Sequence, residues 1–216
     1  MKSRRGSDGL QQYGPRVGAL SLCSMLLATP ASAHHAMGGA TPSDGWEGFL
    51  SGLAHPVIGL DHLAFVVAAG LMATLHRRGA FIPIAFVTAS LIGTAVHGLA
   101  WNRPAPEVAI SLSVLLFGAF LMARRQSLPL PVGLASVAGV FHGYAYGESI
   151  VGAEMTPLGA YLLGLALVQL AIGVSTRSLF QIAARRAPDM GGVTLRWAGI
   201  VICCVGLAYL GSQWVS

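Results

Sequence analysis

The chain has 216 residues, of which 54% are hydrophobic and only 10% are charged. A soluble domain carries roughly 25% charged residues, so the composition excludes a soluble domain and indicates a protein largely surrounded by lipid. The net charge of +5 does not indicate nucleic-acid binding, because Lys and Arg lie before the first apolar run or in the short turns between later runs.

The N-terminus has the pattern of an export signal. Basic residues are followed by an apolar run over residues 17–28 and then by Ala31-Ser32-Ala33, a typical cleavage sequence. The run is shorter than the roughly 20 residues that a membrane-spanning helix needs. We therefore expect a signal peptide over residues 1–33 and a mature chain that begins at His34. The alternative is an uncleaved anchor.

Six later apolar runs are each long enough, or nearly so, to cross a bilayer as a helix. The sequence therefore predicts an all-α, polytopic membrane helix bundle with six transmembrane helices over residues 53–216, after a periplasmic segment over residues 34–52. The runs are Leu53–Leu75, Phe81–Ala100, Glu107–Ala123, Leu130–Ile150, Pro157–Thr176 and Val193–Trp214.

The distribution of arginine predicts the orientation of these helices. When the turns are assigned alternately to two sides, one side receives eight arginines and the other receives only Arg103. The arginine-rich side is cytoplasmic by the positive-inside rule. A cleaved signal independently places the mature N-terminus in the periplasm. We expect a multi-pass protein of the bacterial inner membrane, in which helices one to three and four to six form an inverted repeat.

Six histidine and carboxylate side chains interrupt the apolar runs. A charged group inside the bilayer costs roughly 2.5–3.5 kcal/mol on insertion scales, so such residues usually serve a function. With the predicted orientation, all six lie toward the periplasmic side, and imidazole and carboxylate groups are ligands for divalent transition metals. We therefore predict a shared metal site formed by His55, Asp61, His62, His97, His142 and Glu148.

The spacing in the first run limits how one ion could be bound. His55 and His62 share a helical face but lie about 10.5 Å apart along a straight axis at 1.5 Å per residue. Proline suits a first helical position, so we expect a helix to begin at Pro56, with residues 46–52 as a separate interfacial piece. Alternatively, the two histidines bind the ion in turn. Asp61 either orients an imidazole or supplies a charged ligand to the ion. The alternative is a buried Asp–His pair that serves packing alone.

The fourth run carries Gly139, Gly143 and Gly147 at four-residue spacing, which predicts close contact with another helix. This contact would place His142 against a neighbour, for which we favour the first helix. Tyr146 follows one turn later. It either hydrogen-bonds His142 and modulates the site or anchors the helix at the membrane interface.

The remaining histidines and cysteines allow two interpretations each. His97 is either a metal ligand or a helix-end residue. His34 and His35 either capture metal in the periplasm, where the free amino terminus would assist, or form a disordered polar tip. Adjacent cysteines rarely pair, so Cys203 and Cys204 are better interpreted as small core residues than as metal ligands.

Two motifs resemble those of the HupE/UreJ family of membrane proteins, which is associated with nickel supply to hydrogenase and urease. They are His55-Pro56-x-x-Gly59-x-Asp61-His62 and Phe141-His142-Gly143-x-Ala145-x-Gly147. The resemblance implies a divalent-metal permease over nearly the whole mature chain. This sequence departs from the family pattern in having Tyr146 in place of a second histidine and Glu148 one residue early. The departure implies either an altered metal preference, such as cobalt or copper, or a changed transport rate.

We therefore predict an inner-membrane permease that takes up a divalent transition-metal ion, with nickel favoured and cobalt or copper as alternatives. The ion is the transported substrate, and we expect no permanently bound cofactor and no enzymatic activity. Membrane lipids are the expected surroundings, nucleic acid is not a partner, and a homo-oligomer remains open. The alternatives are a metal-dependent intramembrane hydrolase, although the sequence lacks HExxH, and a haem-binding subunit that uses His97 and His142.

Overall fold

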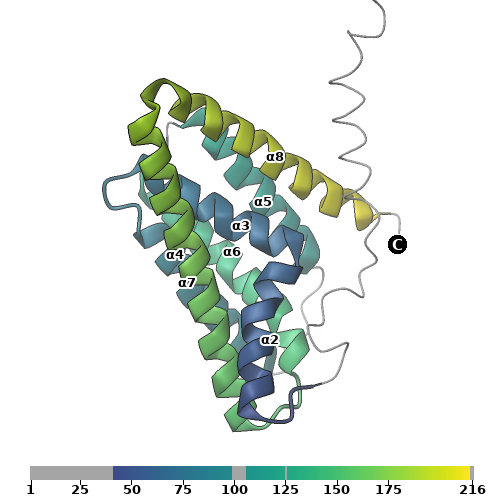
Figure 1. Ribbon diagram of the computed structural model, residues 1–216. Coiled ribbons are helices and arrows are strands. Elements are labelled where there is room, and N and C mark those ends of the chain that lie inside the picture. Colours follow the sequence, from purple (N-terminus) through teal and green to yellow (C-terminus); the bar gives the residue numbers. More distant parts are fainter. Residues whose placement is uncertain (1–40, 99–105, 125, 215–216) are drawn as a thin grey trace, which may run out of the picture.

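The computed structural model describes residues 41–98, 106–124 and 126–214, and all regular elements within these ranges are helical. This confirms the all-α prediction for the described chain. The predicted signal peptide, His34 and His35 lie outside the described residues. The main helices are α2 (Gly45–Ile58), α3 (Leu60–Met72), α4 (Phe81–Gly98), α5 (Pro106–Ala123), α6 (Pro129–Gly147), α7 (Met155–Arg186) and α8 (Gly191–Ser212), as drawn in Figure 1.

Several of these helices have the length and apolar character of membrane spans. α5, α7 and α8 qualify individually, and α2 with α3 would form a fourth span that is bent by 80° at the junction. α4 is apolar but shorter. Large apolar side chains such as Leu163, Val174 and Val201 are exposed on the helix surfaces, as expected where lipid is the solvent. The structure thus indicates a membrane protein with three or four spans by this criterion, and the predicted six are not confirmed.

The start of α2 has a well-defined cause. The Asp44 side chain caps the helix by accepting a hydrogen bond from the backbone N–H of Glu47 at 2.9 Å. The Glu47 carboxylate in turn accepts from the backbone N–H and the hydroxyl of Ser43, both at 2.8 Å. This arrangement is similar to a capping box, except that the Glu47 carboxylate bonds the residue before the cap and not the cap residue itself. α2 therefore begins at Gly45, and both the predicted helix start at Leu53 and the separate piece over residues 46–52 are wrong.

The helix break in the first predicted span lies at Gly59 and not at Pro56. Pro56 is accommodated near the end of α2, and Gly59 adopts an extended conformation with φ −74° and ψ 105° between α2 and α3. A Cβ atom on Gly59 would lie 2.6 Å from Cδ2 of His62. Glycine therefore allows the chain to bend close to the imidazole ring.

Three helix pairs make the most extensive contacts: α4 with α6, α2 with α7, and α5 with α8. The predicted glycine stripe of α6 does form a close contact, since Gly139 and Gly143 meet the backbone of Phe86 and Ser90. That neighbour is α4, not the first predicted span. Small residues allow such close approach of helices in a membrane.

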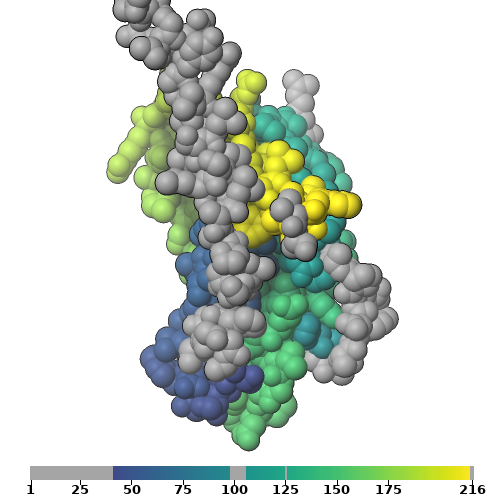
Figure 2. Space-filling model, turned by 90° about the vertical axis from the view of Figure 1, so that its right-hand side faces the viewer, coloured from purple at the N-terminus to yellow at the C-terminus, as the bar shows by residue number. Residues whose placement is uncertain are grey.

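The helix pairs surround α3, which supplies much of the core. Figure 1 shows α3 in the middle of the bundle, and its residues Phe65, Ala68 and Met72 are fully buried. Figure 2 shows α2 and the C-terminal part of α8 at different ends of one face. The rings of Phe86 and Phe117 each lie 4.6 Å from that of Phe65, measured between centroids. This aromatic cluster lies beside the residues that the sequence singled out.

Candidate metal site

The bend at Gly59 brings the two histidines of the first motif together. The ring centroids of His55 and His62 lie 5.9 Å apart, and both residues are buried. Asp61 is also buried, in the first turn of α3, where its Oδ1 atom accepts a hydrogen bond from the backbone N–H of His62 at 2.9 Å. A carboxylate is favourable at this end of a helix because the helix dipole is positive there.

A small cavity of about 60 Å³ lies beside these residues. It offers three carboxylates and two imidazoles, which are suitable donors for a divalent transition metal, and it has room for a few water molecules. Its lining comes from α2, α3, α5 and the end of α6, through His55, Asp61, His62, Glu107, Ile110, Ala145 and Glu148. The structure therefore brings together four of the six predicted site residues, namely His55, Asp61, His62 and Glu148.

Glu107 was not singled out by the sequence patterns. It lies in the first turn of α5, where the third apolar run begins. The signal that could have identified Glu107 is the one that identified Glu148, namely an acidic residue at one end of a predicted span.

The cavity is not a closed coordination sphere. Within the described ranges, no three or more His, Cys, Asp or Glu side chains are arranged to hold one metal ion. An ion in this cavity would therefore keep part of its water shell.

His142 lies behind the cavity and does not line it. Its side chain is fully buried, and its Nδ1 atom is 2.9 Å from Nδ1 of His62. Its Nε2 atom is 3.1 Å from the hydroxyl oxygen of Ser113 on α5. The ring also packs on Phe65, with centroids 4.7 Å apart. His142 thus contacts the first motif through His62, although sequence reasoning placed it among the direct ligands.

His55 has an equivalent set of partners. Its Nδ1 atom is 3.1 Å from the hydroxyl oxygen of Ser149 and 3.4 Å from that of Tyr161 on α7. The Tyr161 hydroxyl donates to the backbone carbonyl of Tyr146 at 2.8 Å. Neither Ser149 nor Tyr161 was predicted from the sequence.

The two motifs share a spacing whose meaning becomes clear only from the contacts in the structure. In each, an acidic residue follows a histidine by six positions and a hydrogen-bonding side chain follows by seven, as His55-Asp61-His62 and His142-Glu148-Ser149. The two motifs contact each other through these residues. Ser149 of the second motif contacts Nδ1 of His55 in the first, and His62 of the first motif contacts Nδ1 of His142 in the second.

Tyr146 is fully buried, so its predicted role as an interfacial anchor is wrong. Its ring packs against His62 and His55, with centroid distances of 4.6 Å and 5.2 Å. Its hydroxyl has no hydrogen-bond partner among the described residues, so the predicted hydrogen bond to His142 is not found. The side chain of Tyr146 therefore contacts the cavity histidines through its ring.

His97 lies away from the cavity lining, in the last turn of α4. Its ring packs on Tyr144 at a centroid distance of 4.4 Å, and its buried Nδ1 atom has no partner within the described structure. Cys203 donates a weak hydrogen bond to the backbone carbonyl of Leu115 at 3.5 Å, between α8 and α5. Cys203 therefore lies at a contact between two helices, although it is only partly buried.

Comparison with known proteins places these motifs in a family. The family model described as HupE / UreJ protein matches residues 22–209. The chain belongs to the HupE/UreJ family. It is 32% identical over 191 residues to Protein HupE of Rhizobium leguminosarum bv. viciae, an alignment that covers 85% of this chain and 93% of that relative. No solved structure matches. The predicted resemblance is thereby confirmed, and the HupE/UreJ family is associated with nickel and cobalt transport.

Proposed function

We propose that this protein is an inner-membrane permease that takes up a divalent transition-metal ion from the periplasm, with nickel the first candidate. One observation carries the proposal: a cavity in a membrane helix bundle is lined by Asp61, Glu107 and Glu148 together with His55 and His62. Ionisable groups within membrane helices are costly and usually mark an ion path. Membership of the HupE/UreJ family supports the same function.

The position of the cavity supports entry from the periplasm. Glu107 begins α5 and Asp61 begins α3, whereas Arg124 follows the end of α5 and Arg77 and Arg78 follow the end of α3. The cavity and these arginines therefore lie at opposite ends of the same helices. Because arginine-rich turns are retained in the cytoplasm, the cavity end is the periplasmic end.

The chemistry of the lining divides into two tasks. The three carboxylates attract the cation and compensate its charge, and the imidazoles of His55 and His62 replace part of its water shell. Below them, the buried His142 packs on the rings of Phe65 and Phe86. These three side chains are buried, so an ion path through this part of the bundle would require them to move. The sequence has no Walker A motif, so a gradient, the membrane potential or a partner must supply the energy.

Cobalt or copper is the alternative substrate, because Tyr146 occupies the position of a family histidine. Tyr146 contacts both cavity imidazoles and is absent from the cavity lining, so any influence on metal preference acts through the placement of those rings. The haem alternative loses support, because both ring nitrogens of His142 have protein partners.

Uptake of ⁶³Ni²⁺ into proteoliposomes tests the proposal. We expect uptake by the wild type, loss in Asp61→Asn and His62→Ala, and wild-type uptake in Asp189→Asn, which removes an exposed carboxylate outside the cavity. Competition with Co²⁺, Cu²⁺ and Zn²⁺ then ranks the substrates. Wild-type vesicles that take up none of the four ions above the level of empty vesicles would exclude the permease and favour the hydrolase alternative.

A further inference from the structure

Both cavity histidines are held through Nδ1 by groups outside the cavity, and this determines which nitrogen can bind a cation. A neutral imidazole carries one N–H and one lone pair, and only the nitrogen with the lone pair can be a metal ligand. The position of the proton therefore matters as much as the position of the ring. Counting the available hydrogens along each chain of contacts assigns that proton.

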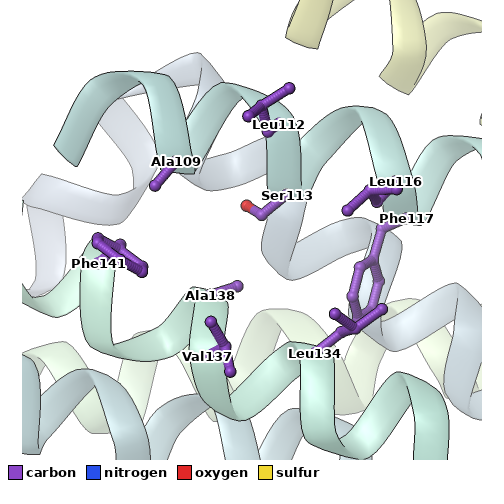
Figure 3. Close-up of a pocket in the computed structure, with 9 residues that line it drawn as sticks. All are labelled: Ala109, Leu112, Ser113, Leu116, Phe117, Leu134, Val137, Ala138 and Phe141. Carbon is purple, nitrogen blue, oxygen red and sulfur yellow. The ribbon is translucent and has the colours of Figure 1, made fainter. Parts of the chain in front are cut away.

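The first chain of contacts begins at Ser113. Its hydroxyl donates to the backbone carbonyl of Ile110 at 2.7 Å. A serine hydroxyl has one hydrogen, so the 3.1 Å contact with His142 requires Nε2–H of His142 to donate to the Ser113 oxygen. Figure 3 shows Ser113 on α5, across a gap from the residues of α6. The walls of this gap are mostly apolar and include Leu116 and Phe117.

This assignment continues to His62. A fully buried imidazole against aromatic rings is costly to charge, so His142 is neutral and its Nδ1 atom carries the lone pair. The 2.9 Å contact between the two Nδ1 atoms then requires Nδ1–H of His62 to donate to His142. The lone pair of His62 is therefore on Nε2, and His62 lines the cavity.

The second chain of contacts reaches the same result for His55. The Tyr161 hydroxyl uses its hydrogen on the backbone carbonyl of Tyr146. The Ser149 hydroxyl directs its hydrogen to the same carbonyl or to the Tyr161 oxygen, both at 3.0 Å. Neither hydrogen is left for His55, so Nδ1–H of His55 donates to Ser149 at 3.1 Å. The lone pair of His55 is again on Nε2.

We propose that Ser113, acting through His142, and Ser149, assisted by Tyr161, are positioning residues that hold both cavity histidines as Nδ1–H tautomers, so that in the neutral rings the lone pair that can bind a metal ion is on Nε2. This inference rests on the proposed function and adds residues that do not contact the ion. Groups that fix the tautomer of a metal-binding histidine typically change metal affinity 10- to 100-fold when they are removed.

Two measurements test the proposal on the full-length protein in detergent or lipid. The ¹⁵N spectra of histidine-labelled, metal-free protein report the tautomers directly, and uptake kinetics report KM and Vmax for the metal. We expect Nδ1–H at His55 and His62 in the wild type. We expect Ser113→Ala to alter the nitrogen signals of His62 and His142, and Ser149→Ala those of His55, with KM raised about 10-fold or more and Vmax changed less.

Matched variants separate this role from general damage to the fold. Ser113→Thr keeps the hydroxyl and should restore both the tautomer and KM. Ser136→Ala removes a serine of α6 that only donates to the backbone carbonyl of Val132, and it should behave as wild type. An Nε2–H tautomer at His62 in the wild type, or a Ser113→Ala protein with unchanged spectra and KM, would overturn the proposal. The spectra need no transport, so a wild type that takes up no metal would refute the proposed function alone.

Discussion

The Nδ1 atoms of His62 and His142 lie 2.9 Å apart across 80 residues of sequence. This contact joins the two motifs that the sequence singled out, and it shows that they contribute in different ways. His62 faces the cavity, whereas His142 is fully buried behind it. The candidate site is therefore a cavity of acids and imidazoles that is supported from behind by hydrogen bonds.

Gly59→Ala should abolish metal uptake while leaving a folded protein. The new Cβ atom would lie 2.6 Å from Cδ2 of His62, so the imidazole must leave its position in the cavity. The control is Gly133→Ala in α6, where a Cβ atom meets no other atom within 4 Å and alanine favours the helix. ⁶³Ni²⁺ uptake and thermal unfolding in detergent report the two effects. Normal uptake by Gly59→Ala would show that the position of His62 is not critical.

Glu107→Gln should weaken metal capture. The substitution removes one of the three carboxylate charges of the cavity with little change of shape. We expect KM for the ion to rise about tenfold, which corresponds to about 1.4 kcal/mol of lost binding free energy. Glu154→Gln, in an exposed carboxylate at the start of α7, should leave KM unchanged. An equal effect of both variants would indicate general surface electrostatics and not a local site.

Gly143→Ala should destabilise the fold. A Cβ atom on Gly143 would collide with the backbone of Ser90, so α4 and α6 must separate, and overpacking of this kind costs roughly 1–3 kcal/mol. The midpoint of thermal unfolding should fall by several degrees. Gly159→Ala in α7, where a Cβ atom meets nothing within 4 Å, should not lower it. If Gly143→Ala unfolds at the wild-type temperature, α4 and α6 are not in close contact in the membrane.

Two substitutions of Tyr146 should distinguish its effect on the stability of the fold from its effect on the choice of transported metal. Its hydroxyl has no partner in the described structure, so Tyr146→Phe should leave thermal stability unchanged or slightly raised, because an unpaired buried polar group is removed. Tyr146→His introduces the histidine that the resemblance to the HupE/UreJ family implies at this position, and it should shift uptake toward nickel relative to cobalt and copper. Competition assays with ⁶³Ni²⁺ measure the ratio. An unchanged ratio would remove Tyr146 as a determinant of metal preference.

Part of this site could be predicted from the sequence because charge in a membrane helix is conspicuous. His55, Asp61, His62 and Glu148 each interrupt an apolar run, and all four line the cavity. Glu107 carries the same signal in a weaker form, because it is the first residue of its run. His142 also interrupts an apolar run, but the pattern does not distinguish a ligand from a residue that supports a ligand.

The remaining features depend on tertiary contacts that leave no pattern in the sequence. Ser113, Ser149 and Tyr161 are ordinary residues of membrane helices until their partners are known. The position of the break could not be predicted either, because Pro56 is tolerated near the end of α2 while Gly59 takes the extended conformation. The spacing did correctly show that one straight helix could not bring His55 and His62 to a single ion.

The most direct test of the central claim, that this cavity binds the ion, is an X-ray absorption spectrum of the purified protein loaded with Ni²⁺. The account predicts oxygen and imidazole nitrogen ligands, a smaller imidazole contribution in His62→Ala, and weaker loading in Asp61→Asn. A nickel–sulfur contribution from Cys203 or Cys204, or a spectrum and metal content unchanged in both variants, would contradict it.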